Sequence, residues 1–349
     1  MKHKIWTSWV VIATGLLLLI VAIVNYTIDP YAQYKDPKAY INNQRVVLPG
    51  LSENLDYESI ILGTSMTENF DINQINELFD TNVIKLSMAG ASLREQYEIA
   101  NKALGSEKEI ETVFWGLDFF KFNIDDYNYD KSEISSYLLD GNRWNDYKYL
   151  ISLKTLNDAI KLYNYNHNII PYFQGGITDL EKYAYWGDFY DFYDFNETVV
   201  LEDYSKVIKE INDTKTFNMS PTKTIVDYIK PIIRANPNVE FNLFLTAPSI
   251  LYYSYANRMN ENSNEMINEI RLALVEELGH LSNVNLFDFS IEKEWTHNLD
   301  NYKDVSHYKP EINKEMMERI FNNENVINSD NVEAINKEFL KQVSSYEAP

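Results

Sequence analysis

Apolar residues are grouped along this chain in one long N-terminal run and five short internal runs. The short runs are rich in β-branched and aromatic residues, as buried strands are; they cover Ser59–Gly63, Asn82–Leu86, Thr112–Leu117, Phe241–Ala247 and Val284–Phe289. Helical periodicity lies between them, over Asn73–Phe79, Ser92–Leu104, the segment around Thr222–Ala235, and Glu265–Leu278, which Gly279 follows as a C-cap. Alternating strands and helices predict an α/β fold with a doubly wound, mainly parallel five-stranded sheet. In such sheets the functional site lies at the carboxyl ends of the strands.

One long segment interrupts this alternation, between the third and fourth predicted strands. A structureless loop from about residue 119 to 221 is improbable, so we expect a partly helical insertion covering the top edge of the sheet. Its Asp-Phe-Tyr repeat at Asp188–Phe195 fits either a glycan-binding strip or an ordinary half-buried surface, and the second is the commoner case. From Asn325 onward the polar composition predicts a loose helix with a frayed tail.

The N-terminal apolar run is long enough to cross a membrane. Ile5–Val24 holds no charged residue, and a helix of that length spans roughly 30 Å, the thickness of the hydrocarbon layer. A cleaved signal peptide is the main alternative, but bulky residues stand where a small-x-small cleavage site would follow. Lys2 and Lys4 precede the run and favour a cytoplasmic N-terminus. We therefore expect a cytoplasmic N-terminus and transmembrane anchor over residues 1–25, and an extracytoplasmic domain over 26–349 that carries the insertion.

Charge and composition exclude several classes of site. The chain has 31 basic and 52 acidic residues, so its formal charge is −21; without Lys2 and Lys4 the remainder carries 29 − 52 = −23. A domain this acidic is not expected to bind nucleic acid through its phosphates. The absence of cysteine excludes disulfides and thiolate chemistry. The sequence also lacks a phosphate-binding glycine loop and a zinc-binding His/Glu spacing, so we expect neither a cofactor nor a metal.

A serine follows the first predicted strand in a setting suited to a nucleophile. In Ile60–Phe70 the strand leads through Gly63 to Ser65, and we expect a helix to begin there. The backbone N–H groups of such a helix N-terminus could stabilise an oxyanion. Ser65 and Glu68 also match a capping box, which requires no catalysis.

A histidine near the C-terminus could activate this serine. Asp304 and His307 lie three residues apart, a spacing that allows the carboxylate to hold the imidazole. Of the five histidines only His307 combines a nearby Asp with a position after the last strand. His297 and Asp300 form a weaker competing pair.

These three segments together resemble a known superfamily. Gly-x-Ser after the first strand, a glycine after the second, and Asp-x-x-His before the last helix resemble the SGNH (GDSL-like) hydrolases and acyltransferases. With the apolar run and the juxtamembrane Asn25–Tyr31, the chain looks most like the membrane-anchored bacterial branch, which includes teichoic-acid D-alanylation proteins of the DltD type and alginate-type O-acetylation proteins.

The resemblance implies roles for particular residues. Ser65 would be the nucleophile, His307 the base and Asp304 the orienting acid. Gly90 would supply an oxyanion-hole N–H, although a glycine there also suits a tight turn. Asp118 departs from the pattern, because many members have an oxyanion-donating Asn at that place and an ionised carboxylate cannot donate. Asp118 is then expected to orient the substrate or a loop, or else the hole is built from the backbone alone.

The sequence therefore favours a serine esterase or O-acyltransferase that acts on an acyl ester of a cell-envelope glycan. The resemblance allows a membrane-bound O-acyltransferase as partner. The alternative is an inactive scaffold or glycan-binding protein that attaches to a membrane acyl-export partner. From the net charge we expect an uncharged or weakly charged acceptor, reached by the aromatic residues around Tyr183–Tyr193.

Overall fold

The chain forms two compact units in the computed structural model. The structure describes residues 2–36, 39–124, 130–167, 169, 177–179, 194–209 and 219–349. The first unit, here called the anchor unit, comprises Met1–Leu55 and Glu133–Tyr183; the second, the sheet unit, comprises Asp56–Ser132 and Ala184–Pro349. The predicted insertion is thus shared between the two units. Tyr183–Tyr193, including most of the Asp-Phe-Tyr repeat, lies outside the described residues.

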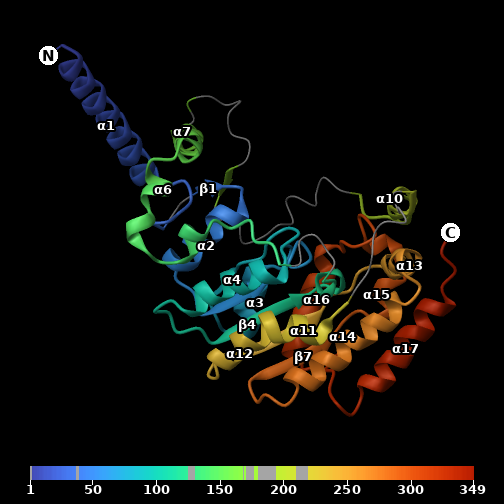
Figure 1. Cartoon of the computed structure of the whole chain (residues 1–349). Helices are drawn as coiled ribbons and strands as arrows, with labels where there is room; N and C mark the ends of the chain where they lie inside the picture. The colour runs from blue at the N-terminus through green and yellow to red at the C-terminus, as the bar shows by residue number, and fades with distance from the viewer. Residues whose placement is uncertain are drawn as a thin grey trace. The chain divides into compact units, whose positions relative to one another are not determined.

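The sheet unit contains the predicted five-stranded parallel sheet (Figure 1). Its strands run in the order β3-β2-β4-β6-β7, and every neighbouring pair is parallel. Their bounds are β2 Ser59–Leu62, β3 Val83–Lys85, β4 Thr112–Leu117, β6 Glu240–Leu245 and β7 Val284–Asp288. All five therefore lie within two residues of the ranges that the apolar runs predict, and the predicted fold class is confirmed.

The strand order creates a switch point between β2 and β4. From β2 the chain crosses to β3 on one side, and from β3 it returns past β2 to β4 on the other. Loops that leave β2 and β4 at their carboxyl ends consequently diverge, and such a crevice is the usual ligand site of doubly wound sheets. Ser65 follows β2 and Asp118 follows β4, so both stand at this point.

Helices cover both faces of the sheet (Figure 1). Helices α3 (Ile72–Phe79) and α16 (Pro310–Phe321) pack against each other on one face. The other face is covered by α4, α12 and α14, and a further helix, α17, packs on α14. The bounds are α4 Leu93–Leu104, α12 Lys230–Ala235, α14 Ser263–Leu278 and α17 Val332–Ser345. The helix expected around residues 222–235 consists of α11 (Pro221–Thr224), the π-helical η4 (Ile225–Ile229) and α12.

The C-terminal helix is packed, so the expectation of a loose helix is wrong. Phe339 of α17 is buried, and the guanidinium of Arg271 lies 4.3 Å from the centre of its ring. Arg271 is itself fully buried in α14 and paired with Asp288 at the end of β7, at 2.5 Å. This aromatic face on a neutralised guanidinium is a favourable contact that a polar composition does not reveal.

The anchor unit is built around the first helix. It contains α1 (Lys2–Ile28), α2 (Gln44–Asn54), α5 (Ser136–Leu139), η2 (Arg143–Asn145), α6 (Tyr147–Leu150), α7 (Leu153–His167) and the antiparallel pair β1 (Ala39–Ile41) and β5 (Ile177–Asp179). Of the described helices, α1 is the one that is long and apolar enough to cross a membrane. Its side chains are exposed from Ile5 to Ile20; Trp6 is 68 % exposed and Leu17 is 64 % exposed.

Candidate active site

Ser65 stands in a tight turn rather than at the start of a helix. Gly63 leaves β2 with φ +146°, and a Cβ there would lie 2.5 Å from the Thr67 hydroxyl, so only glycine fits. The turn continues to Asn69, and α3 begins only at Ile72. The helix expected at Ser65 is therefore absent, and its dipole is not available to an oxyanion.

The side chain of Glu68 explains this difference. In a capping box it would bond back to the backbone N–H of Ser65. Instead Glu68 is buried, and its charge faces the ammonium of Lys85 on β3. Lys85 in turn donates to the Phe70 carbonyl at 3.0 Å. This tertiary contact replaces the local cap and holds the turn on the sheet.

The structure brings together the three side chains that the sequence predicts as a triad. Ser65 Oγ lies 2.8 Å from His307 Nε2. On the other side of the ring, His307 Nδ1 lies 2.8 Å and 3.0 Å from the two carboxylate oxygens of Asp304. Since Nδ1 faces a carboxylate, it carries the proton of a neutral ring, and Nε2 is left to accept from the Ser65 hydroxyl.

The Asp304 carboxylate is held in its charged form. Burial alone would raise its pKa, but hydrogen bonds from the His307 ring and from the backbone N–H groups of His307 and Ser306 outweigh burial. The pKa of Asp304 consequently lies well below its usual range. The lowered pKa keeps Asp304 an acceptor for the imidazole at neutral pH.

The loop that carries Asp304 and His307 is fixed by contacts from three other segments. Ser249, which precedes α13 (Ile250–Met259), donates from Oγ to the Val305 carbonyl at 2.7 Å. Asp203 of α10 (Glu197–Lys209) accepts from the Val305 N–H at 3.1 Å. Tyr308 donates to the Met66 carbonyl at 3.0 Å, which links this loop directly to the turn of Ser65.

Two residues that line one cavity, Ser65 and Gly90, have backbone N–H groups without a protein acceptor among the described residues. Gly90 has φ +64°, is exposed, and lines the cavity beside Ser65. Within the described ranges, neither the Ser65 N–H nor the Gly90 N–H donates a hydrogen bond to another residue. Two unengaged N–H groups on the loops that follow the neighbouring strands β2 and β3 suit an oxyanion hole.

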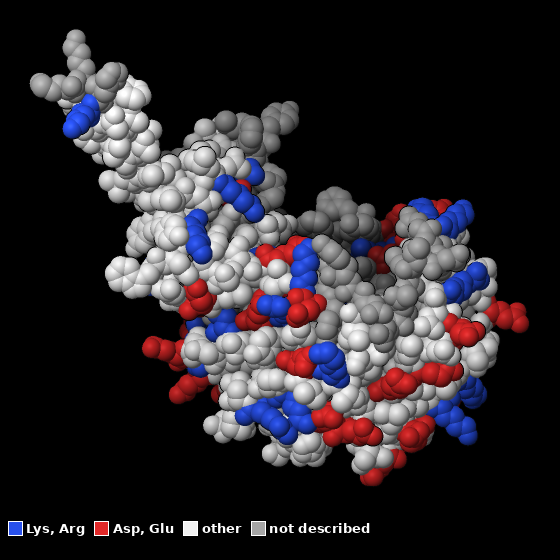
Figure 2. Space-filling view, viewed as in Figure 1, with Lys and Arg blue, Asp and Glu red and all other residues white. Residues whose placement is uncertain are grey.

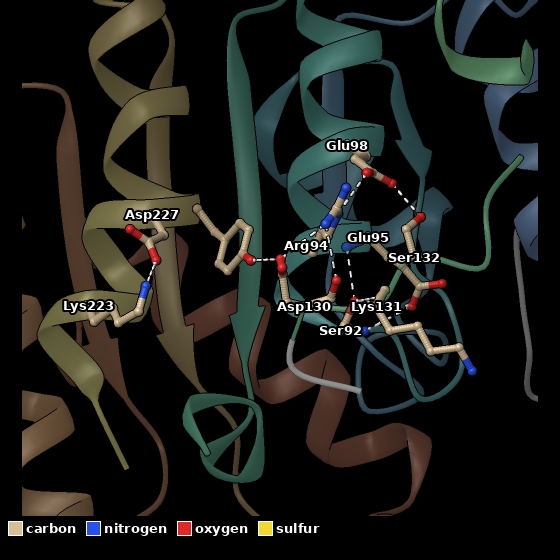
Figure 3. A network of polar contacts seen from close by, with 10 residues as sticks. Ser92, Arg94, Glu95, Glu98, Asp130, Lys131, Ser132, Lys223 and Asp227 are labelled. Atoms are coloured by element: carbon tan, nitrogen blue, oxygen red, sulfur yellow. Dashed lines mark hydrogen bonds and ion pairs between the residues drawn. The ribbon is translucent and has the colours of Figure 1, made fainter. Parts of the chain in front are cut away.

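The segment after Gly90 is fixed by a dense polar network (Figure 3). Ser92 and Glu95 form a capping box at the start of α4, and the Ser92 hydroxyl also donates to the Lys131 carbonyl at 2.7 Å. Arg94 lies 3.1 Å from Glu98 and 3.2 Å from Asp130. The chain at 130–132 is thereby tied to α4, which keeps the Gly90 turn in place.

Asp118 lies beneath the turn that carries Ser65. Its carboxylate accepts hydrogen bonds that hold loops together, and it does not donate one to an oxyanion. One carboxylate oxygen accepts from the Thr64 hydroxyl, and the other accepts from the Thr246 hydroxyl at 2.8 Å. Burial raises the pKa of Asp118, whereas these two hydrogen bonds oppose the rise. Asp118 thus connects the ends of β2, β4 and β6, and this geometry favours the loop-orienting alternative.

A cavity of about 210 Å³ opens beside Ser65 and His307. Gly90, Lys121 and Ser306 stand at its mouth, where side chains are partly exposed. Its inner walls are apolar and buried; they are formed by Leu117, Phe119, Leu245, Tyr252, Ile267 and Ile270. An apolar space that begins beside the Ser65 hydroxyl is suited to the apolar part of a small ligand.

The competing pair does not assemble. His297 Nδ1 lies 3.0 Å from the Thr296 hydroxyl, and its ring packs edge-on to Tyr346. Asp300 instead accepts from the Glu197 N–H at 3.0 Å. Among the described residues, no group of three or more His, Asp or Glu side chains is arranged to hold a metal.

Four contributing residues were not found from the sequence. Thr64 and Thr246 adjoin the ends of strands, so a search for hydroxyls at the carboxyl edge would have found them. Asp203 and Tyr308 act through single contacts between distant segments, and no local pattern predicts those contacts.

Comparisons with known proteins identify no family. No protein-family model matches the sequence, and no curated protein matches it significantly. Among solved structures, the chain is similar to a protein from Streptococcus pneumonia provisionally described as a platelet activating factor, with 10% identity, a TM-score of 0.40, and coverage of 89% of this chain and 98% of that one. It is also similar to a carbohydrate esterase whose active site is described as having divergent catalytic and non-catalytic binding functions, with 10% identity, a TM-score of 0.29, and coverage of 76% and 63%. Neither similarity is high enough to support a statement on function.

Proposed function

We propose that this chain is a membrane-anchored, extracytoplasmic serine esterase or O-acyltransferase of the SGNH type. One observation carries the proposal: Ser65 Oγ lies 2.8 Å from His307 Nε2, and Asp304 lies 2.8 Å from Nδ1 of the same ring. A serine hydroxyl is a weak nucleophile until such a base takes its proton. The three residues come from two loops separated by 242 positions in sequence, so local structure does not require them to meet.

The geometry supports a two-step mechanism. Nε2 of His307 takes the proton as Ser65 Oγ attacks the acyl carbonyl, and Asp304 stabilises the resulting imidazolium. The N–H groups of Ser65 and Gly90 donate to the oxyanion, which collapses to an acyl-serine as the alcohol leaves with the proton from His307. In the second step His307 deprotonates an acceptor hydroxyl, which attacks the acyl-serine; the ester bond to Ser65 Oγ then breaks, and His307 returns the proton to Oγ. Water as acceptor gives hydrolysis, and a sugar hydroxyl gives transfer.

The proposed acceptor is an uncharged or weakly charged cell-envelope glycan. The ectodomain carries −23 by composition, which repels polyanions. Acidic and basic side chains are interspersed on the face shown in Figure 2. Arg94 is paired with Glu98 and Asp130, and Arg143 with Glu53 and Asp146, so neither guanidinium is available to offset that charge. A membrane-bound O-acyltransferase that supplies the acyl group is the proposed partner.

The location is inferred from α1. Its side chains are exposed from Ile5 to Ile20, which water would disfavour and a bilayer would accommodate. Lys2 and Lys4 support a cytoplasmic N-terminus, by the positive-inside rule. The sheet unit would then act outside the cytoplasm.

The deciding experiment measures reaction of the full-length chain, in detergent or nanodiscs, with a fluorophosphonate probe and with small activated esters. The wild type should label and hydrolyse. Ser65→Ala should abolish labelling and lower hydrolysis by roughly a thousandfold or more, His307→Ala should come close to this, and Asp304→Asn should leave a trace. Ser106→Ala, at the far end of α4, should label like the wild type. Equal labelling of wild type and Ser65→Ala would exclude Ser65 as the nucleophile.

The alternative function is a scaffold or glycan-binding protein that keeps the fold without catalysis. Asp118 favours it, because this carboxylate takes the place of an amide donor in many members of the superfamily that the chain resembles. A chain that binds envelope glycan equally well with and without Ser65→Ala, and that reacts with neither probe nor esters, would establish this alternative.

A further inference from the structure

Exposed apolar side chains are concentrated in the anchor unit. Outside Ile5–Ile23, ten large hydrophobic side chains are exposed among the described residues, and eight of them belong to the anchor unit. Only Val226 and Phe321 belong to the sheet unit, although that unit is the larger one. Single exposed apolar residues are ordinary, but such a concentration marks an interaction surface.

Most of these side chains come from η2, α6 and α7, residues 143–167, which we call the collar. Trp144 is 91 % exposed and Tyr147 is 56 % exposed. On α7, Leu153, Ile160 and Tyr163 are exposed at spacings of seven and three residues, which places them along one stripe of the helix. The opposite side of α7 is already buried in the unit, through Ala159 and Leu162. The exposed stripe is therefore additional to the face that stabilises the fold.

The collar is fixed to the end of α1. The buried side chain of Asn25 donates to the Leu150 carbonyl at 2.7 Å and to the Ser152 carbonyl at 3.1 Å, at the junction of α6 and α7. Tyr149 of α6 donates to Asp29 at 2.7 Å, and Tyr31 donates to Asp158 of α7 at 2.8 Å. The exposed side chains of the collar are thus held beside the last turns of the apolar helix.

The charge of the collar is opposite to that of the chain. Residues 143–167 contain four basic and two acidic residues, a net +2 in a chain of −21. Both acids are paired within the collar: Asp146 lies 3.9 Å from Arg143, and Asp158 lies 3.3 Å from Lys161. The remaining positive charge comes from two lysines. Lys148 and Lys154 are exposed. Exposed Trp and Tyr together with Lys is the composition found where proteins meet the headgroup layer of a membrane.

We propose that the collar lies in the headgroup layer of the membrane that α1 crosses, with Trp144, Ile160 and Tyr163 inserted at the boundary of the acyl chains. This proposal rests on the membrane anchor proposed above, and it does not depend on the catalytic activity. Continuity with α1, the exposed stripe and the local positive charge all favour lipid as the occupant. The anchor unit then rests on the membrane surface at two places, which restricts its tilt.

The experiment exploits the absence of cysteine from the chain. Single cysteines replace Ile160, Val226 and Leu17 in full-length protein, which is spin-labelled and reconstituted in nanodiscs of phosphatidylcholine with or without phosphatidylglycerol. Accessibility is then measured to oxygen, which concentrates in lipid, and to a water-soluble nickel complex. Val226 is the matched control, being an exposed apolar residue of the sheet unit (44 % exposed), and Leu17 reports insertion of α1.

The label at Ile160→Cys should be several-fold more accessible to oxygen than to nickel, more so with phosphatidylglycerol, while the label at Val226→Cys shows the reverse. If the label at Leu17→Cys is exposed to lipid but the label at Ile160→Cys is exposed to water, the collar proposal is overturned and the membrane anchor is not. A water-exposed Leu17→Cys would overturn the anchor itself. Protection of Ile160→Cys in native membranes but not in nanodiscs would overturn lipid as the occupant in favour of a protein partner.

Discussion

Asp203 accepts a hydrogen bond at 3.1 Å from the backbone N–H of Val305, the residue after Asp304. The two residues are 102 positions apart, and Asp203 belongs to α10, part of the region that interrupts the regular alternation of strands and helices. Val305 is also held from its other side, where its carbonyl accepts from Ser249. The insertion therefore contributes directly to the position of the proposed acid and base.

Replacing Asp203 should reduce the proposed activity without removing it. Asp203→Ala leaves the Val305 N–H without its charged acceptor, and hydrogen bonds of this type contribute about 1.5–3 kcal/mol. We expect kcat to fall by roughly tenfold with little change in KM, since the loss is one of alignment rather than of substrate contact. Ester hydrolysis by the full-length chain measures both constants.

Two variants separate alignment from general loosening of α10. Asp203→Asn keeps a carbonyl oxygen that can accept from Val305 and should recover most of the activity. Asp300→Ala removes the contact to Glu197 at the start of the same helix and should leave kcat unchanged. A fall in kcat for Asp300→Ala equal to that for Asp203→Ala would count against a specific role for Asp203.

Asp118 should favour activity at the expense of stability. Burial raises its pKa, so the folded chain binds this proton more tightly than the unfolded chain. Stability contributed by Asp118 is therefore lost as pH rises from the ordinary carboxyl pKa of about 4 through the raised value. Asp118→Asn has no proton to lose, so its stability relative to the wild type should increase from acid to neutral pH in urea titrations.

The same residue should affect the serine turn. Asp118→Ala removes both hydroxyl contacts and should lower kcat by roughly tenfold, whereas Asp118→Asn should keep one acceptor and lose less. Asp330→Asn, on the exposed surface, is the control for both measurements. A stability difference between Asp118→Asn and the wild type that stays constant with pH would contradict the assignment of a raised pKa.

Lys85 predicts a second pH effect, above neutrality. Burial lowers its pKa to about 7, and the charges of Glu68 and Asp71 only partly oppose this. The unfolded chain keeps the proton up to its ordinary pKa of about 10.4, so between about pH 7 and 9 the unfolded state binds more protons and stability rises with pH. The slope from one such group is at most about 1.4 kcal/mol per pH unit.

Thermal or urea unfolding between about pH 7 and 9 tests whether stability rises with pH. The pH range stops at about 9 because the tyrosines of the unfolded chain titrate near 10. Lys85→Met should be less stable overall, because the Phe70 carbonyl loses its donor, but its stability should not rise with pH. Lys337→Met, on the exposed side of α17, should keep the wild-type slope. The same slope in Lys85→Met and wild type would show that another group is responsible.

The sequence predicted those features that depend on local patterns. Short apolar runs identified all five strands, because a strand buried on both faces must be apolar throughout. The contact between Ser65 and His307 was predictable because carboxyl ends of parallel strands converge on one edge. The catalytic roles of Ser65, His307 and Asp304 stay a prediction until the variants are measured.

Features that depend on distant partners could not be predicted. The Ser-x-x-Glu pattern that begins at Ser92 forms a capping box, whereas the same pattern beginning at Ser65 does not. At Ser65 the carboxylate of Glu68 is instead buried, where its charge acts on the ammonium of Lys85 on a neighbouring strand. Likewise Phe339 follows a polar stretch, and only the buried Arg271 beneath it shows why the last helix packs.

The cavity beside Ser65 predicts which acyl groups the site accepts. Its volume of about 210 Å³ exceeds the roughly 150 Å³ that holds a benzene ring in an engineered protein cavity. Two polar groups of its inner walls are already engaged: the Asp118 carboxylate by two threonines, and the Tyr253 hydroxyl by Ser290. An apolar acyl group of about six carbons therefore suits it better than acetyl, since each buried methylene contributes about 0.8 kcal/mol.

Hydrolysis of a series of activated esters from acetate to octanoate measures this preference. Four additional methylenes should raise kcat/KM for the hexanoate by roughly a hundredfold over the acetate. Ile267→Phe and Ile270→Trp, which fill the inner end of the cavity, should shift the optimum to shorter chains without abolishing hydrolysis of acetate, whereas the surface variant Val226→Trp should leave the series unchanged. If hydrolysis is fastest with acetate and slows with each added methylene, the acyl chain does not enter the cavity. Labelling of Ser65 by the fluorophosphonate would still be evidence that Ser65 is the nucleophile.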